Sequence, residues 1–274
     1  MFEAILKYQF LQNAIFASLL ASIVCGIVGA LVIEKKLIMM SGGIAHTAYG
    51  GVGLGYLLGF EPIIGAVIFS VISAVGVGLL KNKKGGSDIV IALLWSLGMA
   101  LGILFIGLMK GYPPDMNSYL FGDILTVTRL DIYFMLALTI VVCIVVFIFF
   151  QSWKSFLFDQ EYAKINGLPV TLMEYALLIL IALTIVVLIR VAGIILMLAL
   201  LTAPAATAGL LSNKLGSRML IASILGICFC LVGLTVSYFV NIASGAIIVI
   251  LSVVVYGVTL AITSLIKGKK KSKV

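Results

Sequence analysis

Residues 39–59 read MMSGGIAHTAYGGVGLGYLLG, a stretch long enough to cross a lipid bilayer as one helix. Glycine weakens a helix by about 1 kcal/mol relative to alanine, so a run this rich in glycine needs a compensation. Gly51, Gly55 and Gly59 recur every four residues, and this small-xxx-small pattern lets helix backbones approach closely in lipid. We therefore expect a tightly packed membrane helix here.

The only histidine of the chain, His46, lies in the middle of this stretch. Its face of the helix also carries Gly42, Gly50 and Gly53, all within about 40° of one direction. The imidazole is therefore expected to face a strip with almost no side-chain bulk, along which a small solute could pass. A histidine in a membrane helix can also serve only as a hydrogen-bonding partner of its neighbour. We favour a functional role because intramembrane ionisable residues are scarce and costly.

The composition is that of an integral membrane protein, with 63% hydrophobic and 10% charged residues. Apolar runs of about 20 residues repeat along the chain, and each can span the bilayer. The net charge of +8 would suggest a nucleic-acid partner in a soluble protein. Here the basic residues lie in short connections and in the C-terminal tail, which the positive-inside rule explains better, so no nucleic acid is expected.

The apolar runs predict an all-α polytopic helical bundle with about nine transmembrane segments. Their approximate ranges are 13–33, 39–58, 62–80, 89–108, 132–150, 174–190, 191–211, 218–239 and 242–266. The sixth and seventh come from one unbroken apolar run, and Arg190 marks the expected break. With the N-terminus outside, this division places 14 of the 18 lysines and arginines on the inner side, together with the C-terminus.

Two polar connections are long enough to have a function. The outer one, 110–131, contains Asp123 in a Phe-Gly-Asp turn, where it can be a gate residue or a cap. In the inner one, 151–171, Asp159 can cap a short helix that ends near Gly167. This short helix is amphipathic, so it suits the docking of a partner protein or, alternatively, a position on the lipid headgroups.

The seventh predicted segment contains a proline, Pro204. Because proline has no N–H to donate to the carbonyl of Leu200, a bend is expected there. Thr202 and Thr207 can bond to backbone groups near the bend. Such a helix can line a transport pathway or simply pack tightly.

Five stretches, in order along the chain, together resemble the membrane-spanning permease subunit of ABC importers for zinc, manganese and related divalent metals. They are residues 46–59, of the form H-x-x-x-G-G-V-x-L-G-x-L-L-G, and residues 119–125, 158–168, 204–208 and 244–246. The implied fold is a type II ABC importer-like permease, with residues 1–274 forming a single transmembrane permease domain in the cytoplasmic membrane.

The resemblance implies a homodimer of this chain with two cytoplasmic ATPase subunits, which use the ATP. An extracellular metal-binding protein would deliver the ion, and this chain would bind no cofactor. His46 is the implied metal ligand. The implied pathway and gate residues are Gly42, Tyr49, Gly50, Gly53, Asp123, Pro204 and Thr207. The implied contacts with the ATPase are Phe158, Asp159, Glu161, Ala163 and Gly167.

The chain departs from the family pattern at the position four residues before the histidine. The family usually has aspartate there, whereas this chain has Gly42. An imidazole without a carboxylate binds zinc, iron, copper or nickel better than manganese, which prefers oxygen ligands. Zinc is therefore the first expectation, with manganese or iron as further ones. Glu61, Asp115 and Asp123 are candidates to supply a carboxylate from elsewhere.

Other classes of function fit the sequence less well. The chain has no Walker A glycine-lysine loop, which favours an ATPase on a separate chain. A secondary cation transporter would normally carry several intramembrane carboxylates, whereas the acidic residues here lie in loops or at helix ends. A membrane enzyme is not favoured, because neither H-E-x-x-H nor G-x-S-x-G is present. An ABC permease for chelated metal, such as cobalamin or a siderophore, is the nearest alternative.

Overall fold

Helices make up nearly all of the computed structural model, which describes residues 7–80, 87–110, 119–120, 122, 124–240 and 242–271. Within these ranges there is no strand. In chain order the elements are α2 (Gln9–Glu34), α3 (Ile38–Leu58), α4 (Pro62–Leu80), α5 (Ser87–Gly107), the 3-10 turn η1 (Ile124–Thr126), α7 (Arg129–Ile148), α8 (Phe150–Phe158), α9 (Gln160–Ile165), α10 (Val170–Leu211), α11 (Leu215–Val240) and α12 (Ser244–Lys271).

In the described ranges, seven helices are long and apolar enough to cross a membrane: α2, α4, α5, α7, α10, α11 and α12. The glycine-rich α3 has 21 residues, a length that also suits a crossing. Because α10 has 42 residues and consists of two helices joined at a kink, counting both halves and α3 gives about nine segments. The predicted all-α polytopic membrane bundle is confirmed, with nine as an approximate number.

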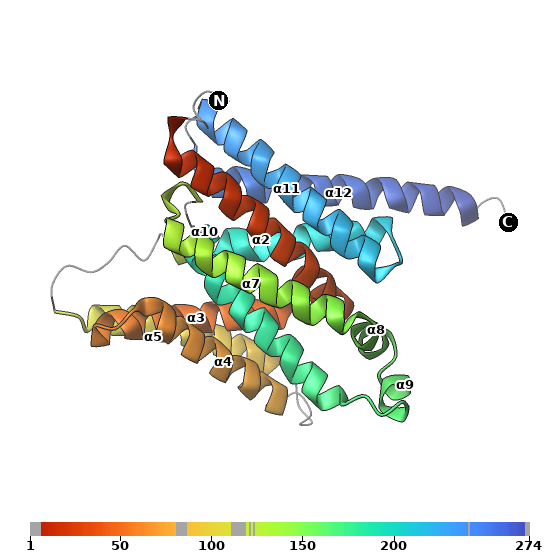
Figure 1. Cartoon of the computed structure of the whole chain (residues 1–274), viewed down its shortest axis with the longest axis horizontal. Coiled ribbons are helices and arrows are strands. Elements are labelled where there is room, and N and C mark those ends of the chain that lie inside the picture. Colours follow the sequence, from red (N-terminus) through yellow and green to blue (C-terminus); the bar gives the residue numbers. More distant parts are fainter. Residues whose placement is uncertain are drawn as a thin grey trace.

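The break in α10 lies at Gly193 and not at Arg190, as the sequence had suggested. Gly193 has φ 69° and ψ 167°, a conformation that is accessible almost only to glycine. Figure 1 shows the two halves of α10 running in different directions. The kink therefore divides one long apolar run into two membrane segments.

The helix continues through Pro204 with helical backbone angles, and the bend predicted there stays a prediction. The hydroxyl of Thr202 donates to the carbonyl of Leu198 at 2.7 Å, and that of Thr207 donates to the carbonyl of Ala203 at 2.8 Å. Both threonines therefore bond one turn back along their own helix, rather than to the carbonyl of Leu200 that the proline leaves without its usual donor.

The bundle has three parts (Figure 1). Helices α3, α4 and α5 form one group at the lower left, α11 and α12 lie across the top, and α2, α7 and α10 lie between them. The most deeply buried membrane-length helices are α2 and α10, whose most apolar stretches are 72% buried inside the protein. The group of α3, α4 and α5 holds the histidine.

The small-xxx-small pattern of α3 is used for packing at two of its three glycines. A Cβ on Gly51 would overlap the carbonyl oxygen of Gly65 in α4, and a Cβ on Gly55 would lie 2.6 Å from the Cα of Pro62. Gly59 instead ends α3 with φ 74°, and a Cβ added there would have no neighbour within 4 Å. The pattern therefore predicts the close approach of α3 and α4, while its last glycine serves the turn.

Candidate functional site

His46 lies against α5, where its imidazole stacks on the indole of Trp95. The ring centroids are 4.4 Å apart and the planes are inclined by 21°. The imidazole is half-buried, and its Nδ1 atom is buried with no hydrogen-bonding partner. Trp95 also covers Gly42, because a Cβ there would lie 3.1 Å from Cζ3 of the indole. The tryptophan thus closes the helix face on which the histidine lies.

The glycine strip beside His46 is occupied by α5 along its length. A Cβ on Gly50 would lie 2.9 Å from the carbonyl oxygen of Gly98, and one on Gly53 would lie 2.8 Å from that of Gly102. Within one protomer α5 therefore fills the strip that was expected to be open, and a role of Gly42, Gly50 and Gly53 in a pathway stays a prediction. The same lack of side chains that suggested a passage allows the backbone of α5 to fill it.

The other predicted pathway residues in this part of the chain are buried. Tyr49 is 4% exposed and packs against Gly102 of α5. Pro204 and Thr207 are buried in the second half of α10, which contacts α2 at Gly29. Their role in a pathway stays a prediction. Asp123 and Asp115 lie outside the residues that the structure describes.

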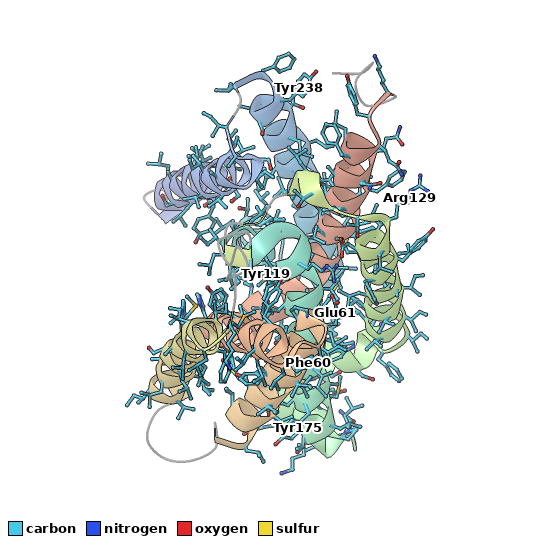
Figure 2. The ribbon with its side chains drawn as sticks, turned by 90° about the vertical axis from the view of Figure 1, so that its left-hand side faces the viewer. Phe60, Glu61, Tyr119, Arg129, Tyr175 and Tyr238 are labelled. Atoms are coloured by element: carbon cyan, nitrogen blue, oxygen red, sulfur yellow. The ribbon has the colours of Figure 1, made fainter. Side chains whose placement is uncertain are left out.

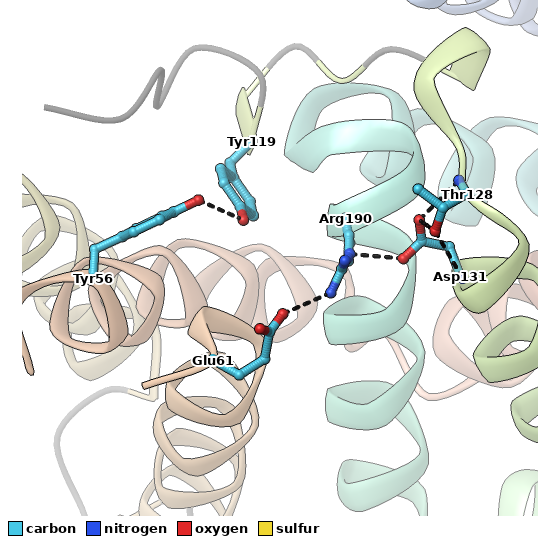
Figure 3. Close-up of polar contacts among 6 residues, drawn as sticks. All are labelled: Tyr56, Glu61, Tyr119, Thr128, Asp131 and Arg190. Atoms are coloured by element: carbon cyan, nitrogen blue, oxygen red, sulfur yellow. Dashed lines mark hydrogen bonds and ion pairs between the residues drawn. The ribbon is translucent and has the colours of Figure 1, made fainter. Parts of the chain in front are cut away.

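Arg190, which the sequence allowed as either an interface anchor or a counter-charge to a carboxylate, belongs to a charged cluster where the residue before α4, the start of α7 and the first half of α10 meet (Figure 3). Arg190 contacts Oε1 of Glu61 through Nη1 at 2.9 Å and Oδ1 of Asp131 through Nε at 2.7 Å. Asp131 also accepts hydrogen bonds from the backbone N–H of Thr128 at 3.0 Å and from its hydroxyl at 2.6 Å. Arg190 is therefore a counter-charge to two carboxylates. The sequence signal for Asp131 was the capping-box spacing Thr128-x-x-Asp131.

Two tyrosines lie beside this charged cluster. The hydroxyls of Tyr56 in α3 and Tyr119 in the outer connection are 3.2 Å apart, and their rings meet edge to face. Burial raises the pKa of Tyr119, and the hydrogen bond with Tyr56 raises it further. Figure 2 shows that Tyr119 lies in the same region of the molecule as Phe60 and Glu61, which belong to the connection between α3 and α4. Since Tyr119 stays protonated at neutral pH, it adds no charge to the cluster.

Glu61 does not supply a carboxylate to His46. Along α3, His46 and Leu58 are separated by about 18 Å at 1.5 Å per residue, and Glu61 lies beyond that end. Its carboxylate is already paired with Arg190. In the described ranges, no three side chains of His, Cys, Asp or Glu come together as a metal site. A metal ion at His46 would need further ligands from outside these described groups.

The short helix predicted in the inner connection is present as α9. The Asp159 carboxylate accepts from the backbone N–H of Tyr162 at 2.9 Å, and Gly167 follows the helix with φ 75°. Of the predicted coupling residues, Phe158 is 48% exposed and Glu161 is exposed, whereas Ala163 is fully buried. Exposed Ile165 adds to the apolar surface. The helix thus presents apolar and acidic groups outward, and Ala163 packs it onto the bundle.

These membrane-length helices, with a short exposed helix between two of them, define a multi-pass membrane protein. A model of the ABC 3 transport family matches residues 7–263, and the chain belongs to this family. An uncharacterised membrane protein of Synechocystis is 43% identical over 257 residues, which cover 93% of this chain and 92% of that protein. The manganese transport system membrane protein MntC of Halalkalibacterium halodurans is 34% identical over 252 residues, covering 92% and 86%.

The fold is also similar to solved structures. A chain of PsaBC from Streptococcus pneumoniae, in complex with Fab, has a TM-score of 0.85 and 33% identity, covering 94% of this chain and 93% of that one. A putative metal-chelate type ABC transporter in an inward-facing conformation has a TM-score of 0.75 at 14% identity, which shows the fold alone. The resemblance drawn from the five stretches is confirmed, and so is the location in the cytoplasmic membrane.

Proposed function

We propose that this chain is the permease subunit of an ATP-driven importer of divalent metal ions. The observation that carries the proposal is the similarity over nearly the whole chain, in sequence and in fold, to proteins named for manganese transport and to PsaBC. The importer would contain two copies of this chain, two cytoplasmic ATPase subunits that use the ATP, and an extracellular metal-binding protein. This chain would serve as one transmembrane permease domain without an ATPase site of its own.

The proposed metal contact is His46, with the further ligands coming from other helices or from the second copy. The buried Nδ1 atom without a partner supports this role, because a buried polar atom that makes no hydrogen bond is costly. An imidazole favours zinc or iron(II) over manganese. The names of the relatives favour manganese. We therefore propose zinc as the first substrate to test and manganese as the second.

The proposed contact with the ATPase is α9 together with Phe158. This role is supported by the exposed apolar and acidic side chains of α9, a helix that lies between the membrane helices α7 and α10 in the sequence. Asp159 caps the helix and buried Ala163 packs it onto the bundle, so its outer surface is already formed in the permease. Such a short preformed helix can transmit a movement of the ATPase to the bundle.

Uptake by vesicles tests the proposal as a whole. The chain is reconstituted with its ATPase subunit, the metal-binding protein is added outside, and the uptake of radioactive zinc and manganese is measured. We expect uptake that requires both ATP and the binding protein. If neither metal accumulates, although the two subunits form a complex that hydrolyses ATP, the proposal is wrong.

A further inference from the structure

Trp95 is the side chain that shapes the surroundings of His46, and the function proposed so far makes no use of it. The indole makes two contacts on α3. It stacks on the imidazole at 4.4 Å between centroids, and its six-membered ring covers Gly42, with Cζ3 3.1 Å and Cη2 3.4 Å from a Cβ at that position. One ring therefore controls both the orientation of the histidine and the space one turn before it.

The packing of α5 on α3 holds this ring in place. One turn beyond Trp95, a Cβ on Gly98 would lie 2.6 Å from the carbonyl oxygen of His46. The hydroxyl of Thr47 donates to the carbonyl of Gly43 at 2.8 Å and also lies 3.3 Å from that of Leu94 in α5. This close packing of the α5 backbone on α3 places Trp95 next to His46.

We propose that Trp95 is a positioning residue that sets the metal specificity of the site at His46. This inference rests on the proposed metal contact of His46. The indole holds the imidazole in one orientation and occupies the space that an oxygen ligand on residue 42 would need. The ion therefore meets a nitrogen donor and an aromatic face on this side, and no carboxylate.

The chemistry of the two rings explains why this arrangement favours zinc over manganese. Manganese prefers carboxylate, carbonyl and water ligands, whereas imidazole suits zinc. An imidazole that binds a cation becomes more positive. The face of an indole attracts positive charge, so stacking on Trp95 strengthens when the ion is bound. This gain depends on a metal–nitrogen bond and is therefore larger for ions that bind imidazole well.

The first test compares the ratio of zinc to manganese uptake in two variants of Trp95. Trp95→Leu removes the aromatic face and is expected to lower the ratio about fivefold or more, whereas Trp95→Phe keeps a ring and is expected to stay within about twofold of the wild type. Trp153→Phe is the matched control, because Trp153 is the only other tryptophan. It is buried in α8, and its Nε1–H donates to the carbonyl of Val145. A loss of both metals in equal proportion in Trp95→Leu would show a purely structural role and overturn the proposal.

The second test does not depend on transport. In Trp153→Phe the remaining tryptophan is Trp95, so its fluorescence reports on the ring stacked on His46. Zinc added to the purified full-length permease chain, without the ATPase and the binding protein, is expected to change this emission, and the added substitution His46→Ala should remove the response. In Trp95→Phe, where Trp153 is the emitter, zinc should have no effect. An emission from Trp95 that does not respond to zinc would contradict the proposal, even if a Trp95→Leu protein failed to fold.

Different results would contradict the proposed metal contact of His46 and the proposed role of Trp95. If His46→Ala transports zinc normally, the metal contact of the proposed function is wrong, and with it the role of Trp95. If His46→Ala abolishes uptake while Trp95→Leu keeps the wild-type zinc to manganese ratio, the proposed function stands and the role of Trp95 is refuted.

Discussion

His46 offers the most direct test at the scale of single residues. If the imidazole binds the ion, His46→Ala should abolish the uptake of zinc, because no other histidine exists in the chain. His46→Gln is the matched control, since its amide can hydrogen-bond but binds zinc poorly. Both variants are measured at equal abundance in vesicles. Wild-type transport by His46→Gln would assign the residue to hydrogen bonding and packing.

Gly42 offers a second test, because the sequence suggests adding a carboxylate there and the structure shows that Trp95 covers the position. A carboxylate one turn from His46 adds a hard oxygen ligand and should widen acceptance toward manganese and slow the release of the ion. Because a Cβ at this position lies 3.1 Å from Trp95, Gly42→Asp must first displace the ring. We expect manganese uptake to rise more in Gly42→Asp combined with Trp95→Leu than in Gly42→Asp alone.

The control for this pair is Gly42→Ala, which adds the Cβ without the oxygen. Uptake of both metals is compared across the single and double variants. If Gly42→Ala increases manganese uptake as much as Gly42→Asp does, displacement of the ring and not the oxygen ligand causes the change.

At the scale of elements, α9 provides a prediction about coupling. Glu161→Gln removes a charge from the exposed side of the helix and should reduce both transport and the stimulation of ATP hydrolysis, without unfolding the permease. Gln151→Ala, at an exposed position of α8 outside the proposed contact, is the matched control and should change neither. Normal ATPase stimulation in Glu161→Gln and also in Gly167→Ala would remove α9 from the proposed interface.

The kink in α10 provides a prediction about stability. Gly193→Ala forces a Cβ onto a backbone with φ 69° and ψ 167°, which is expected to cost about 1–3 kcal/mol. Gly209 lies in the same helix, and a Cβ added there would have no neighbour within 4 Å, so Gly209→Ala should be neutral or slightly stabilising. Thermal unfolding in detergent compares the two variants. Equal unfolding temperatures would show that the kink relaxes without cost.

The same kink shows where a sequence pattern is informative and where it is not. Apolar runs separated by charged or turn residues predicted the membrane helices, because each run must bury itself in lipid. Within the run 174–211 a single glycine such as Gly193 does not by itself distinguish a kink from close packing, so the charge of Arg190 was the natural choice for a break. Arg190 instead pairs with Glu61 and Asp131, contacts that join residues far apart in the sequence. Tertiary packing likewise decides which glycines of α3 contact α4 and which contact α5.

At the scale of the whole molecule, the distribution of basic residues predicts the orientation in the membrane. With 14 of the 18 lysines and arginines on one side, that side should be cytoplasmic and should include the C-terminus. A reporter enzyme that is active only in the cytoplasm, fused after Val274, should be active. Activity only of a reporter that requires export would reverse the orientation.

The contact between α3 and α5 bears on how the molecule can change shape. At Gly98 and Gly102 the two helices approach so closely that a Cβ on either glycine would overlap α3. We therefore expect the pair to behave as one rigid lever in the transport cycle, with hinges outside it. Any movement that brings His46 toward an ion then also moves Trp95. The imidazole therefore keeps its orientation relative to the indole throughout the transport cycle.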